Sequence, residues 1–172
     1  GGIYEDDYFY DLCDKYGINV WQDFMFAGAM VPGDDAFFDN VREEVKYQVK
    51  RLRHHKSIVL WCGNNEVDEG FNNWGWQKSM KKSKQDSTKL WKDYVRLFQD
   101  SIPKWVKEVD PTRPYTSSSP LFGWGREKSY TEGDSYYWGT WCGFADVEAV
   151  QNRTGRFVSE YGMQSMPNYS TT

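Results

Sequence analysis

The sequence of 172 residues contains no long apolar run. A helix that crosses a membrane needs about 20 consecutive apolar residues, and no stretch of this chain approaches that length. The sequence therefore predicts no membrane-spanning helix and no membrane partner. It also begins without Met and without a signal-like segment. The sequence alone thus leaves open whether the protein is exported to a periplasm, a lysosome or the medium.

Cysteine is scarce, and the three residues present, Cys13, Cys62 and Cys142, lie far apart. No Cys-x-x-Cys pair and no Cys/His ligand spacing occurs, which argues against structural zinc, and an odd cysteine count does not support a disulfide framework. His54 and His55 have no partner at ligand spacing either. We expect no metal site, and we expect Cys62 to be a small buried core residue.

The chain also lacks an excess of basic charge and the glycine-rich loops that bind phosphates. It has 21 Lys and Arg against 25 Asp and Glu, for a net charge of -4. The basic clusters at 50–56 and 78–84 are expected to be solvated surface, so nucleic acid is not an expected partner. Neither G-x-G-x-x-G nor G-x-x-x-x-G-K-[ST] occurs, which argues against a doubly wound nucleotide-binding sheet.

Aromatic residues are abundant: Phe, Trp and Tyr make up 18% of the chain, including nine Trp. Aromatic rings offer flat, partly polar surfaces on which the C–H faces of sugar rings can stack. Aromatics also fill ordinary cores, so their abundance alone is weak support for a carbohydrate-binding protein.

Short apolar runs alternate with helical spacing along the chain. The runs that predict strands lie at 18–21, 57–61, 115–118, 135–138 and 157–159. Apolar residues recurring every three or four positions predict helices at 8–13, 37–52 and 90–109. This alternation favours a parallel sheet with helical crossovers, and no repeat or low-complexity linker divides the chain.

Local signals predict where the helices begin and end. Gly17 is the expected C-cap of the first helix, and Asp34 or Asp35 the expected N-cap of the second. Pro103 is expected to kink or divide the third helix, because proline has no N–H to donate. The Trp-, Gly- and Asn-rich segment 70–76 is expected to be a loop, followed by a basic polar stretch.

Two glutamates follow predicted strands. Glu66 comes after the run 57–61, and Glu160 comes after the run 157–159. A carboxylate at the C-terminal end of a buried strand lies where barrel and other α/β enzymes gather their catalytic groups. Glu is mostly exposed in proteins, so a solvated loop position is the alternative for each. A pair of carboxylates is also what a retaining glycosidase needs, at about 5–5.5 Å from each other.

Four segments, taken in order, resemble signature segments of the β-mannosidases of glycoside hydrolase family 2. They are Gly1–Glu5, Trp21–Ala27, Trp61–Glu66 and Ser159–Gly162. In that family the acid/base Glu follows an Asn at the end of the fourth barrel strand, and the nucleophile Glu ends the seventh. The resemblance therefore implies that Glu66 is the acid/base and Glu160 the nucleophile.

The resemblance also implies the fold class, an incomplete (β/α)₈ TIM barrel. With the Glu66 strand as the fourth, residues 1–172 are expected to be part of one catalytic domain, holding about strands 3 to 7. The missing parts would be two strands at the start, one at the end, and the β-sandwich domains that flank the barrel in this family.

Three further site residues are implied. Asn65 matches a family position that hydrogen-bonds the sugar 2-hydroxyl, with a loop-turn role as the alternative. Tyr137 resembles the tyrosine that hydrogen-bonds the nucleophile, with Tyr136 as a rival and core packing as the alternative. Trp74, in the loop after the acid/base, is expected either to line the sugar site or to pack its loop.

The implied chemistry fixes the protonation states and needs no metal or organic cofactor. Glu66 has to be protonated at rest and Glu160 ionised. The pKa of a free Glu is about 4.3, so the pKa of Glu66 needs an upward shift, which the Glu160 charge and a desolvating aromatic wall would supply.

Three functions are in competition. The first is a retaining exo-β-mannosidase that removes terminal β-linked mannose from oligosaccharides or glycoprotein glycans. The second keeps the mechanism but acts on galactosides or glucuronides. The third is a fragment without activity that binds sugar weakly on its aromatic residues, with unpaired strand edges that invite association.

Overall fold

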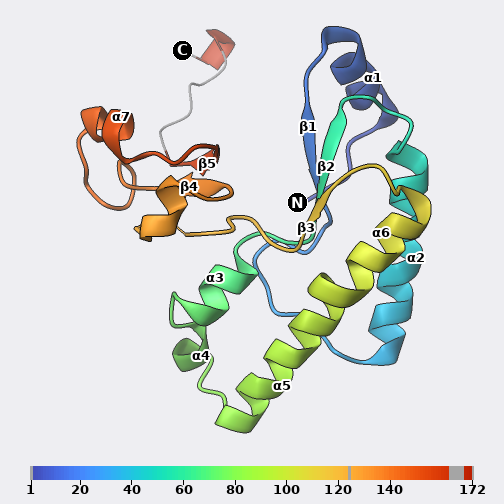
Figure 1. The fold of residues 1–172 in the computed structure, drawn as a ribbon, viewed down its shortest axis with the longest axis horizontal. Coiled ribbons are helices and arrows are strands. Elements are labelled where there is room, and N and C mark those ends of the chain that lie inside the picture. Colours follow the sequence, from blue (N-terminus) through green and yellow to red (C-terminus); the bar gives the residue numbers. More distant parts are fainter. Residues whose placement is uncertain (1, 124, 163–168, 172) are drawn as a thin grey trace. The chain divides into compact units, whose positions relative to one another are not determined.

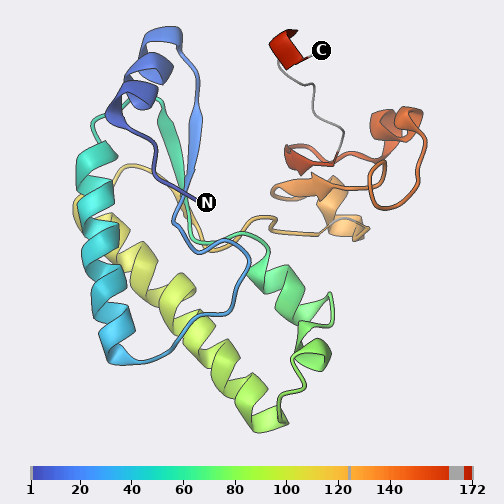
Figure 2. The same cartoon turned by 180° about the vertical axis from the view of Figure 1, so that it is seen from behind.

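The computed structural model describes residues 2–123, 125–162 and 169–171. The chain divides into two compact units, Gly1–Ser118 and Ser119–Thr172, and each unit is described by itself. Figure 1 and Figure 2 show the elements of both units from opposite sides. Within the described residues, no helix combines the length and the apolar character that crossing a membrane requires.

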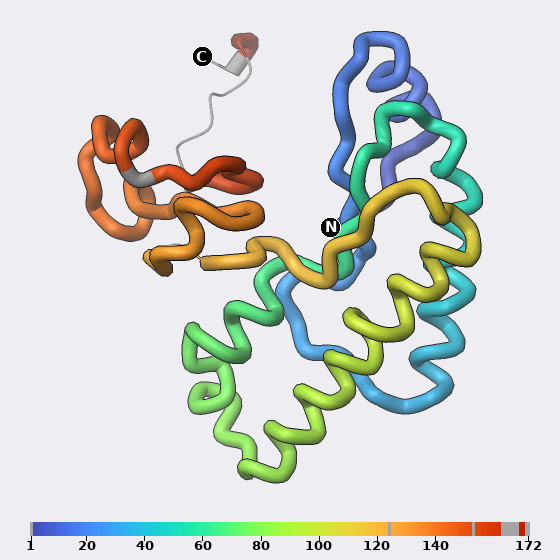
Figure 3. The backbone as a smooth tube through the Cα atoms, viewed as in Figure 1, coloured from blue at the N-terminus to red at the C-terminus, as the bar shows by residue number. Residues whose placement is uncertain are grey.

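The first unit is built on a parallel sheet of three strands. The strands are β1 (Val20–Asp23), β2 (Ile58–Cys62) and β3 (Tyr115–Thr116), and they lie side by side in chain order. Both strand pairs are parallel, and helices connect one strand to the next, as predicted. Figure 3 shows the three backbone segments running together. Their carboxyl ends therefore lie at the same edge of the sheet.

Two helices of this unit follow the predicted pattern closely. Helix α1 (Asp7–Tyr16) ends at the predicted C-cap Gly17, which adopts a left-handed φ of 68°. Helix α2 (Asp35–Leu52) is capped by Asp34, whose carboxylate accepts a hydrogen bond from the N–H of Phe37 at 2.9 Å. The buried residues of α2 recur every three or four positions: Phe38, Val41, Val45, Val49 and Leu52.

The predicted third helix changes its hydrogen-bond register. It consists of α5 (Lys84–Tyr94), the π-helical segment η1 (Val95–Ser101) and α6 (Ile102–Val109). The N–H of Ile102 donates to the carbonyl oxygen of Leu97, five residues earlier.

Pro103 leaves one carbonyl group of the π-helical segment without a donor from the helix. In the π-helical register the Phe98 carbonyl would accept from residue 103, but proline has no N–H. The hydroxyl of Tyr115 donates to that carbonyl instead, at 2.8 Å. Pro103 thus divides the helix, as predicted, and β3 supplies the missing donor.

One hydrophobic cluster forms the core of the first unit. Helices α2 and α6 lie side by side (Figure 1, Figure 2), and both contribute to it. The largest side chain in the cluster, Trp61, is fully buried and stacks on Phe24 with ring centroids 5.8 Å apart. Its members are Tyr10, Phe24, Phe38, Val41, Val45, Val49, Leu52, Ile58, Trp61, Val67, Tyr94, Leu97, Phe98, Ile102 and Val106.

The segment predicted as a loop is partly helical, so that prediction is wrong. Helices α3 (Val67–Asn72) and α4 (Trp76–Ser79) occupy it. Gly70 suggested a loop, but it serves close packing: a Cβ there would lie 2.3 Å from the Trp76 ring. Helix α5 also begins earlier than predicted, because the Ser83 hydroxyl accepts from the N–H of Asp86 and caps it.

The strands of the first unit are shifted or shorter than predicted. β1 begins at Val20, and Ile18, expected in the strand, is exposed. β3 ends at Thr116, because Ser117 and Ser118 turn to bind Asn64.

The second unit contains a pair of short parallel strands, β4 (Ser135–Tyr137) and β5 (Val158–Tyr161). The short helices η3 (Val147–Ala149) and α7 (Val150–Arg153) connect them. The helix η2 (Glu127–Tyr130) precedes β4, and η4 (Tyr169–Thr171) lies near the end of the chain. Trp138 and Phe157, predicted inside strands, lie just outside them.

The predicted fold class is confirmed at its coarser level. All strand pairs of the described residues are parallel, neighbouring strands are consecutive in the chain, and helical segments connect them. This is a parallel α/β arrangement. That the five strands belong to a single incomplete barrel domain spanning residues 1–172 stays a prediction.

Candidate active site

The loop after β2 is held between its two neighbours at the carboxyl edge of the sheet. The N–H of Gly63 donates to the Thr116 carbonyl at 2.8 Å, on the β3 side, and the N–H of Asn65 donates to the Ala27 carbonyl at 3.0 Å, on the β1 side. A Cβ on Gly63 would lie 2.4 Å from the Ser117 carbonyl oxygen. Glycine is therefore needed for this close approach of the backbone.

Glu66 lies at the end of this loop, directly before α3. Its backbone adopts φ 66° and ψ -1°, a left-handed conformation that non-glycine residues seldom take. Its carbonyl oxygen accepts a hydrogen bond from the N–H of Gly70 at 2.7 Å, which starts the helix. The residue is partly buried. Strained backbone of this kind is concentrated at functional sites, so this conformation agrees with the prediction that Glu66 is a site residue.

Two other predicted site residues lie in the same unit. Asn65 is partly buried and directly precedes Glu66. Trp74 follows α3, is 45% exposed, and lies edge-on to Trp76 with ring centroids 6.5 Å apart. Trp76 packs on Gly70, whereas almost half of the Trp74 side chain is accessible. The Trp74 ring could therefore contact a ligand.

Glu160 lies in the second unit, on β5 rather than beyond it. It is partly buried, and the strand register pairs it with Tyr136 of β4. The next pair is Tyr137 with Tyr161. Successive side chains on a strand point to opposite faces, so Tyr136 shares a face with Glu160 and Tyr137 lies on the other face. Tyr137 is 3% exposed.

A buried carboxylate, which the sequence did not single out, organises the segments around β5. Asp134 is 7% exposed. Its Oδ2 accepts hydrogen bonds from the hydroxyls of Ser119 and Ser159, both at 2.6 Å. Its Oδ1 accepts from the N–H of Leu121 at 2.7 Å. Since Ser159 directly precedes Glu160, Asp134 fixes the strand that carries the predicted nucleophile.

The predicted site residues thus fall into two groups. Asn65, Glu66 and Trp74 lie at and beyond the carboxyl end of β2, and Tyr137 and Glu160 lie on the strand pair of the second unit. The prediction that Cys62 is a buried core residue is confirmed, since it is fully buried, and its thiol donates to the Asn64 carbonyl oxygen at 3.5 Å. In the described part of the chain, no group of three metal-ligating side chains occurs.

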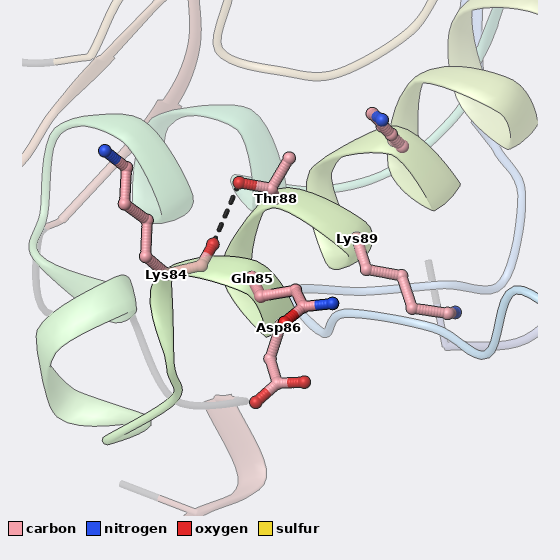
Figure 4. A pocket seen from close by; sticks show the side chains of 6 residues that line it. Lys84, Gln85, Asp86, Thr88 and Lys89 are labelled. Carbon is pink, nitrogen blue, oxygen red and sulfur yellow. Dashed lines mark hydrogen bonds between the residues drawn. The ribbon is translucent and has the colours of Figure 1, made fainter.

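A surface hollow of about 700 Å³ is lined by none of these residues. Its lining comes from α5 alone, as Figure 4 shows for Lys84, Thr88 and Lys89. The hydroxyl of Thr88 donates to the Lys84 carbonyl at 2.8 Å, a contact within the helix. The hollow is a solvated helix face and holds none of the predicted site residues.

Comparison with known proteins finds β-mannosidases among the relatives of this chain. No family model matches the chain. The "Beta-mannosidase" of Bos taurus is 42% identical and that of Capra hircus 44% identical, each over 99% of this chain and 20% of its own length. The chain therefore spans about one fifth of the curated relatives that it matches.

Solved structures extend the comparison. The β-D-mannosidase from Dictyoglomus thermophilum matches with a TM-score of 0.80 and 41% identity, over 99% of this chain and 20% of that one. A β-glucuronidase from Bacteroides uniformis matches with a TM-score of 0.64 at 20% identity, which shows a shared fold only. Over nearly its whole length, this chain is thus similar to β-mannosidases.

Proposed function

We propose that this chain is the central part of the catalytic domain of a retaining exo-β-mannosidase, which removes terminal non-reducing β-D-mannose from oligosaccharides or glycoprotein glycans. The observation that carries the proposal is the match to β-mannosidases over 99% of the chain, with both glutamates in the matched segment. The placement of Glu66 in a strained turn at the carboxyl edge of a parallel sheet supports it.

The proposed reaction has two displacements. In the first, the Glu160 carboxylate attacks the anomeric carbon while Glu66 gives its proton to the departing glycosidic oxygen. The bond between the anomeric carbon and that oxygen breaks, and a mannosyl ester of Glu160 forms. In the second, Glu66 takes a proton from water, whose oxygen attacks the same carbon and releases Glu160. Two inversions leave the product with retained configuration.

The remaining site residues receive supporting roles in this proposal. Asn65 would hydrogen-bond the sugar 2-hydroxyl, and Trp74 would line the sugar site with its accessible ring. The predicted Tyr137, or its rival Tyr136, would hydrogen-bond the nucleophile. The register of β4 and β5 gives the rival Tyr136 the better position for that contact, because Tyr136 is the residue paired with Glu160.

The proposal includes the missing parts of the protein. The five strands would be strands 3 to 7 of a (β/α)₈ barrel, with the remaining strands and flanking β-sandwich domains supplied by the rest of the protein. The coverage of only 20% of the relatives' length supports this, as does the chain order of the parallel strands. The reaction itself calls for no metal or organic cofactor.

Labelling with 2-deoxy-2-fluoro glycosyl fluorides tests the function. The reagents of manno, gluco and galacto configuration are incubated with the full-length protein, and peptide mass spectrometry locates any adduct. Label on Glu160 from the manno reagent alone is the expected result. Label from the galacto reagent instead would support the alternative glycosidase, and no label from any reagent would contradict a retaining mechanism at this residue.

A further inference from the structure

Asn64 lies where the segments after three neighbouring strands meet, and its side chain is fully buried. The loop that contains it binds the Ala27 carbonyl on one side and the Thr116 carbonyl on the other. Its position follows from β2, because only Gly63 separates it from the last strand residue. A buried amide at such a junction has to be hydrogen-bonded, and this one is.

The amide of Asn64 joins two segments that are distant in sequence. Its Nδ2 donates to the Ser117 carbonyl at 2.8 Å, and its Oδ1 accepts from the Ser118 hydroxyl at 2.8 Å. The same Oδ1 accepts from the N–H of Val67 at 3.2 Å. Donor and acceptor are thus both used, so the contacts require an amide rather than a carboxylate or an apolar side chain.

The contact with Val67 bears directly on Glu66. Val67 N–H is one of the first N–H groups of α3, which have no partner within the helix. Because Asn64 binds it across the turn, the residues on both sides of Glu66 are fixed, and Glu66 is held in its left-handed conformation. Glu66 itself makes no side-chain cap of the helix.

We propose that Asn64 is the positioning residue of the acid/base: its buried amide locks the Glu66 turn to the segment after β3 and so aims the carboxyl group for proton transfer. The inference rests on the proposed function. It concerns proton donation rather than sugar binding, because the buried amide of Asn64 already binds Ser117, Ser118 and Val67.

This proposal predicts a loss that depends on the leaving group. Departure of a sugar alcohol needs protonation by Glu66, whereas departure of a dinitrophenolate does not. In the full-length protein, Asn64→Ala is expected to lower kcat/KM for mannobiose on the order of 100-fold, within the usual range for general acid catalysis, and to change that for dinitrophenyl β-mannoside much less.

Three further variants make the experiment specific. Ser118→Ala removes a single hydrogen bond to Asn64 and should show the same pattern, but weaker. Leu52→Ala removes core contacts far from the turn, so any loss it causes should be equal for both substrates. Ser57→Ala is the matched control at the opposite end of β2, since its buried hydroxyl has no hydrogen-bond partner among the described residues.

The outcomes separate the inference from the proposed function. Equal losses on both substrates for Asn64→Ala, as in Leu52→Ala, would overturn the positioning role while Glu66→Ala still showed leaving-group dependence. If Glu66→Ala showed no leaving-group dependence, or the wild-type protein cleaved neither substrate, the proposed function would fail and the inference with it. Should Asn64→Ala not fold, the ratio of the two losses in Ser118→Ala decides.

Discussion

The two predicted catalytic glutamates are held by different kinds of structure. Around Glu66, a sheet and two long helices enclose a large apolar core, and the turn itself is fixed by a buried amide. In the second unit, which holds Glu160, the buried residues include Asp134, which accepts hydrogen bonds from two serine hydroxyls, and the aromatic residues Tyr136 and Tyr137.

The comparison shows two ways to fix a carboxylate. Apolar packing is non-directional and spreads over many contacts, so the loss of any one contact removes only part of the stabilisation. A buried polar network depends on a few directional hydrogen bonds, each of which leaves an unsatisfied group when it is broken. We therefore expect single polar substitutions to disturb the surroundings of Glu160 more than those of Glu66. Truncation of core side chains should have the opposite preference.

The largest expected effect comes from removing the glutamates themselves. Glu160→Ala should lower turnover of every β-mannoside by at least about 10⁴-fold, beyond the usual general acid contribution, because no covalent intermediate forms. Azide should restore activity and give a product of inverted configuration. Glu66→Ala should spare the first step for substrates with good leaving groups.

Steady-state kinetics and product analysis of the full-length protein check this prediction. Glu148→Ala, which removes an exposed glutamate of the second unit, is the control and should leave turnover unchanged. Wild-type turnover in Glu160→Ala would show that the assignment of the nucleophile is wrong.

Core truncation should have the next largest effect, on the first unit. Leu52 is fully buried in the core cluster, so Leu52→Ala should lower the free energy of unfolding by about 2–5 kcal/mol. Tyr47→Ala, on the same helix but 66% exposed, should change it by less than about 0.5 kcal/mol. Denaturant titration gives both values, and equal effects of the two variants would contradict the described core.

A smaller effect is expected from breaking the hydrogen bonds of Asp134 in the second unit. Asp134→Ala leaves buried donors without acceptors, which should cost about 1–3 kcal/mol. Hydrogen exchange should therefore rise in peptides of β4 and β5 and stay unchanged in β2. Asp134→Asn keeps one acceptor oxygen and should have a weaker effect; unchanged exchange in both variants would mean that the network does not hold β5.

The smallest expected effect is a pH dependence of the first unit. Burial opposes ionisation of Asp14, but hydrogen bonds from the Ser57 N–H and from His55 outweigh it and lower the pKa of Asp14 to about 2. A lowered pKa in the folded state contributes stability that is present above about pH 4 and lost as the pH falls toward 2.

We expect this contribution to be about 1 kcal/mol, because the carboxylate is partly accessible to water. Between pH 4 and pH 2, the free energy of unfolding should depend less on pH in Asp14→Asn than in the wild type. Denaturant titration at each pH measures this. An unchanged pH profile in the variant would place the acid sensitivity in other carboxylates.

Much of the fold could be predicted from local patterns. The stripe of α2 and the apolar run of β2 repeat at the periods of a helix and a strand, and their ends carry recognisable caps. Helix α5 was missed at its start because its first turns are polar and exposed, so no apolar period marks them. Its capping residue Ser83 was the available signal.

The sequence offers predictions for the candidate site only where its residues are contiguous. Glu66 and Glu160 lie in ordered motifs; the structure places Glu66 in the loop after β2 and Glu160 within β5. The roles of Asn64 and Asp134 depend on partners far along the chain, such as Ser118 for Asn64, and a single sequence does not reveal such pairs. The same holds for the donation from Tyr115 to the Phe98 carbonyl, on which the π-helical segment depends.

The left-handed backbone of Glu66 sets the stability of the protein against its proposed activity. Glycine would adopt φ 66° without strain, so a glutamate there costs about 1 kcal/mol of folding free energy. The Glu66→Gly variant should thus be inactive, with a free energy of unfolding no lower than that of the wild type. Selection for stability alone would thus favour glycine at this position, whereas selection for the proposed activity would favour glutamate.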